Sequence, residues 1–487
     1  MSDAAQLYDT VIGLEVHIQL HTKSKLFSTD MVQHDSPPNA NVNAITAAHP
    51  GTLPSVNAAA IDMAVLLGLA VGGTMAPNIY FSRKHYLYPD LPKGYQTTQH
   101  QDPIVQGGSL TVSVAGQPIT VAIHHIHLEE DAGKSIHDVH PTYTAIDLNR
   151  AGTPLCELVT EPCLHSAEEA YQFLTALRKL VRWIGVSQGN MEEGNIRCDV
   201  NVSLKPKGST ELGTRVEVKN VNSIRYAKKA IEIEVARLTA MLHNNEVIVQ
   251  ETRGFDAEHE TTYSMRTKED ANDYRYFTCP DLAPILLTTV HIEKIKNTLP
   301  QLPHTLVSKL IHEYTLTQYD AEQLTESVEL YNYFVAVNLL YIAPKTIANL
   351  ILGPVSTIHE ATQQLWVQPC ITTTQVADIA ALLDQGSIAF NIVGKKLLPA
   401  ILNQPNAVVI QVVHDLQLLQ ATDDGAIKAW VTQAIATNPG EVAAYRKGKK
   451  NLIGFFMGQV KKLSNGKAEP KLTQQLLLQQ LDEKATD

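Results

Sequence analysis

The segment at residues 11–20, VIGLEVHIQL, constrains the fold more than any other part of the chain. Apolar and polar side chains alternate through it with a period of two, which predicts a β-strand. One face carries Ile12, Leu14, Val16, Ile18 and Leu20, and the other carries Glu15, His17 and Gln19. The first face should pack on a core. Taken alone, the second face favours an ordinary solvated sheet surface.

The same design returns in three further segments. The polar members of the alternating positions are His125, His127 and Glu129 in VAIHHIHLEED, Arg197, Asp199, Asn201 and Ser203 in NIRCDVNVSL, and Arg215, Glu217 and Lys219 in TRVEVKNV. A plain solvent face would seldom interleave carboxylates with imidazoles and guanidinium groups. If these strands lie side by side, their carboxylates meet on one surface, where they repel unless cations or protons neutralise them.

Such a surface has a defined chemistry. Carboxylate oxygens with one imidazole suit Mg²⁺ or Mn²⁺ holding a polyphosphate, whose oxygens basic side chains on the same face would bind. The predicted metal ligands are Glu15, His17, Glu129, Asp199 and Glu217. The predicted phosphate-binding residues on this face are Arg197, Arg215 and Lys219. The alternative is a salt-bridged sheet surface without function.

The organisation of the 487 residues predicts an α+β protein of several domains. Residues 1–295 mix strand-like alternation with Gly- and Pro-rich loops, whereas 296–405 and 406–487 have the pattern of short helices. In the first domain we expect helices at 167–184 and 224–243, the former beginning with a capping box of Ser166 and Glu169. A final amphipathic helix is expected at 472–481.

Charge and cysteine content argue against several classes of protein. The net charge of -11 disfavours a general nucleic-acid coat, yet residues 445–471 carry eight cations against one carboxylate, Glu469. Five cysteines without a C-x-x-C pair argue against a disulfide framework or a thiolate zinc site. The opening lacks the features of a signal peptide, and the most apolar run is too short to span a bilayer. A cytoplasmic protein with no membrane partner is expected.

Two loops join basic with aromatic residues: FSRKHYLYPDLPKGYQ at 81–96 and NDYRYFTCPD at 272–281. Unpaired bases stack on such rings while cations hold phosphates, so one interpretation is a single-stranded RNA end as ligand. The other is that Tyr and Pro pack a long loop onto the sheet. The Gly-Lys-Ser at 133–135 is no P-loop, because the first glycine that the motif requires is Leu128.

Together the stretches GLEVHIQL, AHPGTLPSVN, SRKHYLYPDLPKGYQ, HLEEDAGKS, DLNRAGTPLCELVTEP, MEEGNIRCDVNVSL, RVEVKNVNS and DYRYF resemble the B-subunit family of glutamyl/aspartyl-tRNA amidotransferases (GatB/GatE). The resemblance runs in order over most of residues 10–290. It implies an antiparallel-sheet cradle similar to glutamine synthetase, a helical domain and a small tail that meets tRNA. It also implies ATP and Mg²⁺, a partner amidase (the A subunit) that supplies ammonia, and a small third partner (the C subunit). The substrates would be tRNA(Gln) or tRNA(Asn) misacylated with glutamate or aspartate.

The resemblance also assigns residues by motif. Metal binding and phosphoryl transfer fall to Glu15, His17, Glu129, Glu130, Asp199 and Glu217. The ammonia route or the acceptor end falls to Lys84, Tyr86, Thr153 and Glu157, and Lys93 serves there or at the cofactor. The tail cations expected to bind tRNA are Arg446, Lys447, Lys449, Lys450, Lys461 and Lys462. Some family members hold a cysteine-ligated zinc beside the PG motif, but NANVNAITAAHPG has no cysteine, so no zinc is expected.

Two other functions remain possible from the sequence. One is a tRNA-binding scaffold that presents its RNA to a separate catalyst and has no catalysis of its own. The other is a ligase acting on free amino acids, which would make little use of the basic tail. Magnesium-dependent ATP turnover separates the scaffold from the enzyme, and removal of residues 406–487 separates the two enzymes.

Overall fold

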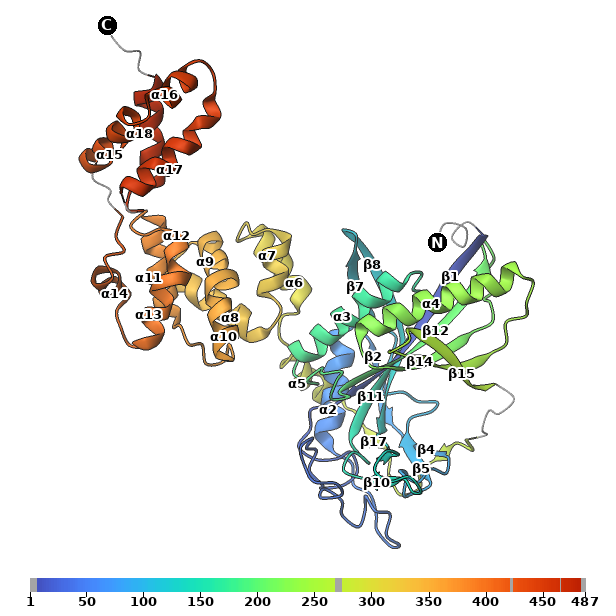
Figure 1. Ribbon diagram of the computed structural model, residues 1–487. Coiled ribbons are helices and arrows are strands. Elements are labelled where there is room, and N and C mark those ends of the chain that lie inside the picture. The colour runs from blue at the N-terminus through green and yellow to red at the C-terminus, as the bar shows by residue number, and fades with distance from the viewer. Residues whose placement is uncertain (1–6, 268–273, 421–423, 465, 483–487) are drawn as a thin grey trace. The chain divides into compact units, whose positions relative to one another are not determined.

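The computed structural model describes residues 7–267, 274–420, 424–464 and 466–482 (Figure 1). Its contacts divide the chain into two compact units, Met1–Leu302 and Pro303–Asp487. The first unit combines a large sheet with helices, and the second is built from helices. The chain is therefore α+β, as the sequence predicts.

A ten-stranded sheet forms the centre of the first unit, in the order β15-β14-β13-β12-β1-β11-β8-β6-β2, with β7 pairing to β8. Neighbours are antiparallel except β13 and β14, which run parallel. The prediction of an antiparallel sheet was wrong at this pair, because helix α4 crosses between the two strands and returns the chain in the same direction. The strands of this sheet are β1 (Tyr8–Gln19), β2 (Thr74–Met75), β6 (Val105–Gln106), β7 (Ser109–Val114), β8 (Gln117–Glu130), β11 (Pro154–Thr160), β12 (Ile196–Pro206), β13 (Val216–Val221), β14 (Glu251–Asp256) and β15 (Thr261–Thr267).

Smaller sheets flank the large one. β4 pairs with both β5 and β16, β9 pairs with β10, and β3 pairs with β17. Their bounds are β3 (Asn78–Ile79), β4 (Ser82–His85), β5 (Tyr95–Thr98), β9 (Lys134–Ile136), β10 (Ala145–Asp147), β16 (Phe277–Thr278) and β17 (Ile285–Leu286). The basic and aromatic loops of the sequence thus meet in one sheet, where β16 brings residues near 277 beside β4.

The predicted alternation of β1 is confirmed. Its apolar side chains from Ile12 to Leu20 are at most 1% exposed, whereas Glu15, His17 and Gln19 are half-buried on the opposite face. β1 lies between β11 and β12, so Glu15 is opposite Asp199, and His17 is opposite both Arg197 and Glu157. This register brings together side chains that are up to about 180 residues apart in the sequence.

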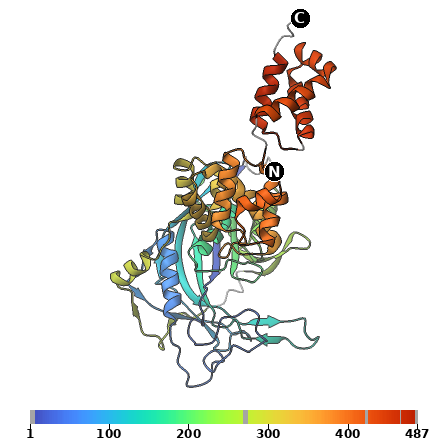
Figure 2. The same ribbon diagram turned by 90° about the vertical axis from the view of Figure 1, so that its left-hand side faces the viewer.

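Helices α3 (Ala167–Trp183) and α4 (Ile224–His243) match the expected ranges and lie side by side across the sheet (Figure 1). The Ser166 hydroxyl accepts from the N–H of Glu169, as predicted for an N-cap. The Glu169 carboxylate accepts from the N–H of His165, one residue before the cap, so the reciprocal half of the capping box was predicted wrongly. Helix α2 (Ala58–Ala70), blue in Figure 2, runs alongside the strands, and α5 (Thr289–Lys296) completes the unit.

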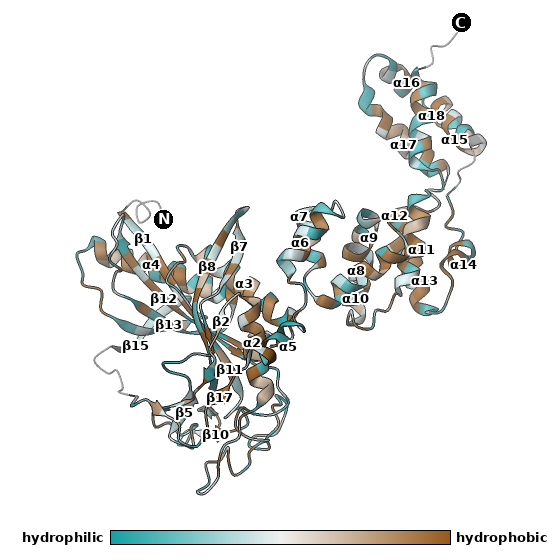
Figure 3. Ribbon diagram, turned by 180° about the vertical axis from the view of Figure 1, so that it is seen from behind, coloured by the Kyte–Doolittle hydropathy of each residue, from teal (hydrophilic) through white to brown (hydrophobic). Residues whose placement is uncertain are grey.

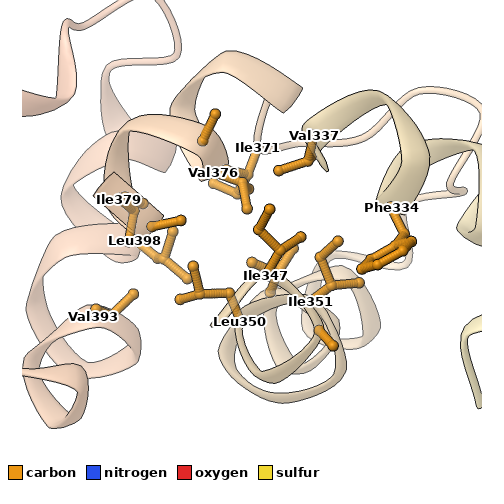
Figure 4. Close-up of a cluster of buried hydrophobic side chains, with 14 of the residues drawn as sticks. Phe334, Val337, Ile347, Leu350, Ile351, Ile371, Val376, Ile379, Val393 and Leu398 are labelled. Atoms are coloured by element: carbon orange, nitrogen blue, oxygen red, sulfur yellow. The ribbon is translucent and has the colours of Figure 1, made fainter. Parts of the chain in front are cut away.

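The second unit contains two hydrophobic cores. The larger lies among the helices between residues 303 and 418, where Phe334, Ile347, Ile351, Val376 and Leu398 meet (Figure 4). Its elements are α6 (Pro303–His312), α7 (Gln318–Leu324), α8 (Val328–Leu340), α9 (Pro344–Leu350), the π-helical turns η2 (Ile351–Val355) and η3 (Val393–Leu397), α10 (Ser356–Thr362), α11 (Thr373–Asp384), α12 (Phe390–Ile392), α13 (Leu398–Asn403) and α14 (Val409–Asp415).

A smaller core holds the tail together. Tyr445, Phe456, Val460, Leu477 and Leu481 pack among its helices, drawn in red in Figure 1. These helices are α15 (Asp424–Ala436), α16 (Pro439–Arg446), the 3₁₀ turn η4 (Lys450–Leu452), α17 (Ile453–Leu463) and α18 (Pro470–Asp482). The helices of this unit carry both apolar and polar positions (Figure 3), as expected when one side packs on a core. None of the helices in the described ranges has the length and hydropathy needed to cross a bilayer.

Candidate active site

The polar face of the central strands lines a cavity of about 330 Å³. Strands β1, β8, β11, β12 and β13 contribute most of its walls, and the β4 segment and Tyr274 close one side. The predicted site residues that line it are Glu15, His17, Lys84, Tyr86, Glu129, Glu157, Arg197, Asp199, Glu217 and Lys219. The expectation that the acidic and imidazole groups converge is therefore confirmed.

A histidine–glutamate cluster consists of His17, Glu129 and Glu157, which line the cavity, and His127, which contacts both carboxylates. His17 Nε2 lies 3.4 Å from Glu129 Oε1 and 3.4 Å from Glu157 Oε2. His127 Nε2 lies 3.1 Å from Glu157 Oε2 and 3.7 Å from Glu129 Oε2. Glu157 thus joins the two imidazoles, because β11 lies between β1 and β8 and all three residues share one row of the sheet.

The electrostatics of this cluster follow from its geometry. Burial alone would lower the pKa of His127, but the contacts with Glu129 and Glu157 outweigh it and raise the pKa to about 9. His17 behaves in the same way, and its pKa is also raised. Burial favours the neutral form of Glu157, yet its bonds to the two imidazoles hold its pKa well below the usual value. Two carboxylates in a small buried space thus require positive charge beside them.

A carboxylate–lysine cluster consists of Glu15, Asp199, Glu217 and Lys219. Lys219 Nζ lies 2.5 Å from Asp199 Oδ2 and 3.0 Å from Glu217 Oε1. Burial disfavours the ammonium, but the two carboxylates outweigh it and raise the pKa of Lys219. Glu15 accepts from Asn201 Nδ2 at 2.9 Å, and burial, helped by the neighbouring carboxylates, raises the pKa of Glu15.

Both clusters have the donors that a divalent cation needs. One ligand atom from each of His17, Glu129 and Glu157 lies within 4.8 Å of the others, and the same holds for Glu15, Asp199 and Glu217. Hard oxygens with at most one imidazole fit Mg²⁺ or Mn²⁺. β-bulges between Val159 and Thr160 and between Cys198 and Val200 interrupt the ladders beside these groups. Bulges reorient the side chains next to them, which helps carboxylates from different strands to converge.

Some predicted residues lie elsewhere. Glu130 and Lys93 form an ion pair with each other and line a separate cavity of about 230 Å³. Adjacent strand residues point to opposite faces, so Glu130 cannot share the site of Glu129, and its inclusion with the cluster was wrong. Thr153 is buried outside the active-site cavity, and Arg215 precedes β13 and lines a third cavity.

An aromatic and basic rim borders the cavity. Lys84 Nζ lies 4.9 Å from the centre of the Tyr274 ring, and Tyr86 meets that ring edge to face at 6.2 Å. Burial, together with the nearby carboxylates, raises the pKa of Tyr86, so its hydroxyl remains a neutral donor. Arg197, which also lines the cavity, donates to Asp131 at 2.8 Å.

Sequence reasoning missed two members of the first cluster. His127 was recognised on the polar face but not assigned to the site, and Glu157 was assigned to the ammonia route or the acceptor end. The pattern PLCELVT alternates in the same way as β1, with Leu155, Glu157 and Val159 on one face. That alternation could have predicted that Glu157 lies on the polar face. It could not have predicted that β11 pairs with β1 and so brings Glu157 opposite His17.

The comparisons with known proteins agree with this geometry. Residues 10–293 match the family model described as the GatB/GatE catalytic domain. The chain belongs to the GatB/GatE family. A second model, described as a GatB domain, matches residues 332–481. This range includes the smaller core of the second unit and most of the larger one.

Curated members of the family are similar over almost their whole length. The relative from Alkalilimnicola ehrlichii is 43% identical over 481 residues, covering 98% of this chain and 99% of its own. The relatives from Nitratidesulfovibrio vulgaris and Legionella pneumophila are 43% and 44% identical and cover 97% of the chain and 99% of theirs. All three are named as the B subunit of aspartyl/glutamyl-tRNA(Asn/Gln) amidotransferase.

The basic tail of this GatB-like chain presents its cations to solvent. They lie in three places: at the end of α16, in the turn between α16 and α17, and at the end of α17. Lys450 pairs with Asp482 at 2.5 Å and lies 4.1 Å from the centre of the Tyr445 ring. The exposed members are Arg446, Lys447, Lys449, Lys450, Lys461 and Lys462.

Proposed function

We propose that this chain is the B subunit of a tRNA-dependent amidotransferase. It transfers the terminal phosphoryl group of ATP to the side-chain carboxylate of Glu-tRNA(Gln) or Asp-tRNA(Asn), and ammonia then displaces phosphate to form the amide. The relatives' names support the reaction class. The observation that carries the proposal is the pair of acidic clusters on one face of the sheet, joined by Glu15 and His17 of the same strand.

The residues divide the work by position. Mg²⁺, when bound by the two clusters, would neutralise the negative charge of the phosphates and the charge that develops during phosphoryl transfer. Lys219 and Arg197 can donate to phosphate oxygens from the β12–β13 side of the cavity. Lys84 and the neutral Tyr86 hydroxyl line the same cavity, and the acceptor carboxylate would bind beside them.

The proposal extends to cofactors, partners and fold likeness. ATP and Mg²⁺ are the expected cofactor set, without zinc. The expected partners are the amidase (A) subunit, the small (C) subunit, and misacylated tRNA(Gln) or tRNA(Asn), and the expected location is the cytoplasm. Lys84, Tyr86 and Thr153, with Lys93, stay assigned to the ammonia route or the acceptor end, whereas Glu157 is reassigned to the histidine–glutamate cluster. A likeness of the cradle to glutamine synthetase, and the domain ranges 1–295, 296–405 and 406–487, remain part of the proposal.

The direct test uses the complex reconstituted with the amidase and the small partner. Amide formation on misacylated tRNA should depend on ATP and Mg²⁺, and Glu129→Ala should abolish it while the release of ammonia from glutamine continues. Full amidation by this variant would contradict the assignment of the site. Magnesium-dependent ATP turnover excludes the alternative, a scaffold that only presents tRNA.

The tail provides a second test. Removal of residues 424–487, which leaves α14 and the larger core in place, should weaken tRNA binding, and the loss should shrink as salt rises, because phosphate contacts release counterions. A ligase for free amino acids would be little affected by the deletion. Unchanged tRNA affinity at all salt concentrations would contradict the tail's role.

A further inference from the structure

Thr252 of β14 lies beside the carboxylate–lysine cluster without being a member of it. β13 and β14 run parallel, and their register sets Thr252 opposite Glu217. The Thr252 hydroxyl donates to Glu217 Oε2 at 2.7 Å. Lys219 Nζ lies 3.0 Å from the other oxygen, Oε1. A donor therefore contacts each oxygen of Glu217, and the two donors come from neighbouring strands.

An ion-pair network on the other face of β14 holds Thr252 in place. Glu251 and Arg253 flank Thr252 in the strand, so their side chains point away from the cluster. Arg253 Nε lies 3.2 Å from Glu234 Oε1 of α4, and Arg253 Nη1 lies 2.8 Å from Glu251 Oε1. Glu234 is fully buried, and Arg237 of the same helix pairs with it at 2.8 Å. Removing either arginine would leave a buried carboxylate short of positive charge, which is costly, so this network fixes β14 on α4.

The two donors to Glu217 differ in what they do when phosphate arrives. The Lys219 ammonium can turn to phosphate oxygens, which releases Glu217 Oε1 for a cation. The Thr252 side chain cannot follow, because it is 8% exposed and branched at Cβ, which restricts its χ1 angle. The hydroxyl thus keeps the carboxylate oriented while Oε1 becomes available. Hydrogen-bond partners of this kind typically change metal affinity by about 10- to 100-fold.

We infer that Thr252 is a positioning residue for phosphoryl transfer, which holds Glu217 in the orientation that binds a divalent cation. The inference rests on the proposed function, which gives the carboxylate–lysine cluster a cation. Thr252 acts through Glu217 and touches neither the cation nor the substrate. The role requires a hydroxyl donor at this position. Serine can therefore take the place of threonine, whereas valine, which has a similar shape and no hydroxyl, cannot.

The test is Thr252→Val in the complex reconstituted with the amidase and the small partner. With a non-hydrolysable ATP analogue present, electron paramagnetic resonance should count two Mn²⁺ ions in wild type. Thr252→Val should bind one of them about tenfold more weakly and the other as tightly as wild type. Glu217→Gln identifies the affected ion, because it should weaken the same one. Amidation by Thr252→Val should fall at limiting Mg²⁺ and recover as the Mg²⁺ concentration is raised.

Two further variants separate positioning from a defect in folding. Thr252→Ser restores the hydroxyl and should recover most of the affinity for the affected ion. Thr239→Val makes the same substitution at a residue of α4 that is 9% exposed and donates to the backbone carbonyl of Val235. Because Thr239 bonds only within its own helix, this control should bind both ions as wild type does.

The outcomes distinguish the inference from the proposed function. Unchanged affinity for both ions in Thr252→Val would overturn the role of Thr252. Equal weakening of both ions, without recovery in Thr252→Ser, would overturn it too, because a structural defect has that effect. If wild type binds no Mn²⁺ with the nucleotide analogue and forms no amide, the proposed function itself fails.

Discussion

The two acidic clusters share one sheet face, yet they neutralise their carboxylates by different means. In the histidine–glutamate cluster the positive partners are imidazoles, which bind a proton or give it up. In the carboxylate–lysine cluster the partner is the ammonium of Lys219, held by Asp199 and Glu217, whose charge persists because its pKa is raised. A cation entering the first cluster finds His17 as a ligand. A cation entering the second must displace Lys219.

This difference predicts an order of binding. The first cluster can bind a cation in the free protein, since its imidazole changes from a proton carrier to a ligand. The second binds one when a nucleotide is present, because phosphate oxygens give the Lys219 ammonium another partner. The two sites would thus assemble in sequence as the substrate arrives.

The largest expected effect comes from breaking the first cluster. Glu157→Gln keeps the size of the side chain but removes the charge that joins His17 and His127, so the cation loses a ligand. Amidation by the reconstituted complex should fall about 100-fold or more, in line with losing a group that stabilises transition-state charge. Gln19→Ala, on the same face of β1 outside both clusters, is the control and should retain activity. Near-normal amidation in Glu157→Gln would show that the first cluster is not needed.

A smaller effect should follow from removing the ammonium of the second cluster. Lys219→Met should let this cluster bind Mn²⁺ without nucleotide, so that electron paramagnetic resonance counts two ions where wild type binds one. ATP affinity should fall about tenfold, because a charged hydrogen bond to phosphate is lost. Lys84→Met is the matched control, since Lys84 lines the same cavity and contacts the Tyr274 ring. Two Mn²⁺ ions of similar affinity in nucleotide-free wild type would contradict the order of binding.

The smallest effect is on stability. Mn²⁺ at about 100 times its dissociation constant adds about 2.7 kcal/mol to the free energy of unfolding of the domain that binds it. The Tm of the free chain should therefore rise by a few degrees. Glu217→Gln should keep this rise, and Glu157→Gln should lose it. If calorimetry shows the same change in Tm with Mn²⁺ for both variants, the proposed difference between the two clusters is contradicted.

Local features of this fold were predictable because their causes are local. The alternation of β1 and the starts of α3 and α4 follow from the side-chain period and from Ser166 and Ser223 at the N-caps. The parallel pair β13 and β14 depends on where α4 returns the chain, which the hydrophobic pattern does not encode. The sequence could thus place side chains on faces but not choose the neighbours of each strand.

The same limit applies to the site. That carboxylates and imidazoles converge could be predicted from four alternating segments. Their division into two clusters could not, because it depends on β1 lying between β11 and β12. Glu157 belongs to the cluster because strand pairing sets it opposite His17, about 140 residues earlier in the chain, and opposite His127. Glu130 was misplaced because motif likeness outweighed the alternation of the strand.

The most direct test of the central claim is a crystal structure with Mn²⁺ and a non-hydrolysable ATP analogue, in which anomalous scattering locates the ions. We predict one ion among His17, Glu129 and Glu157 and a second among Glu15, Asp199 and Glu217, with the phosphates between them. Ions or phosphates bound away from both clusters would contradict the account.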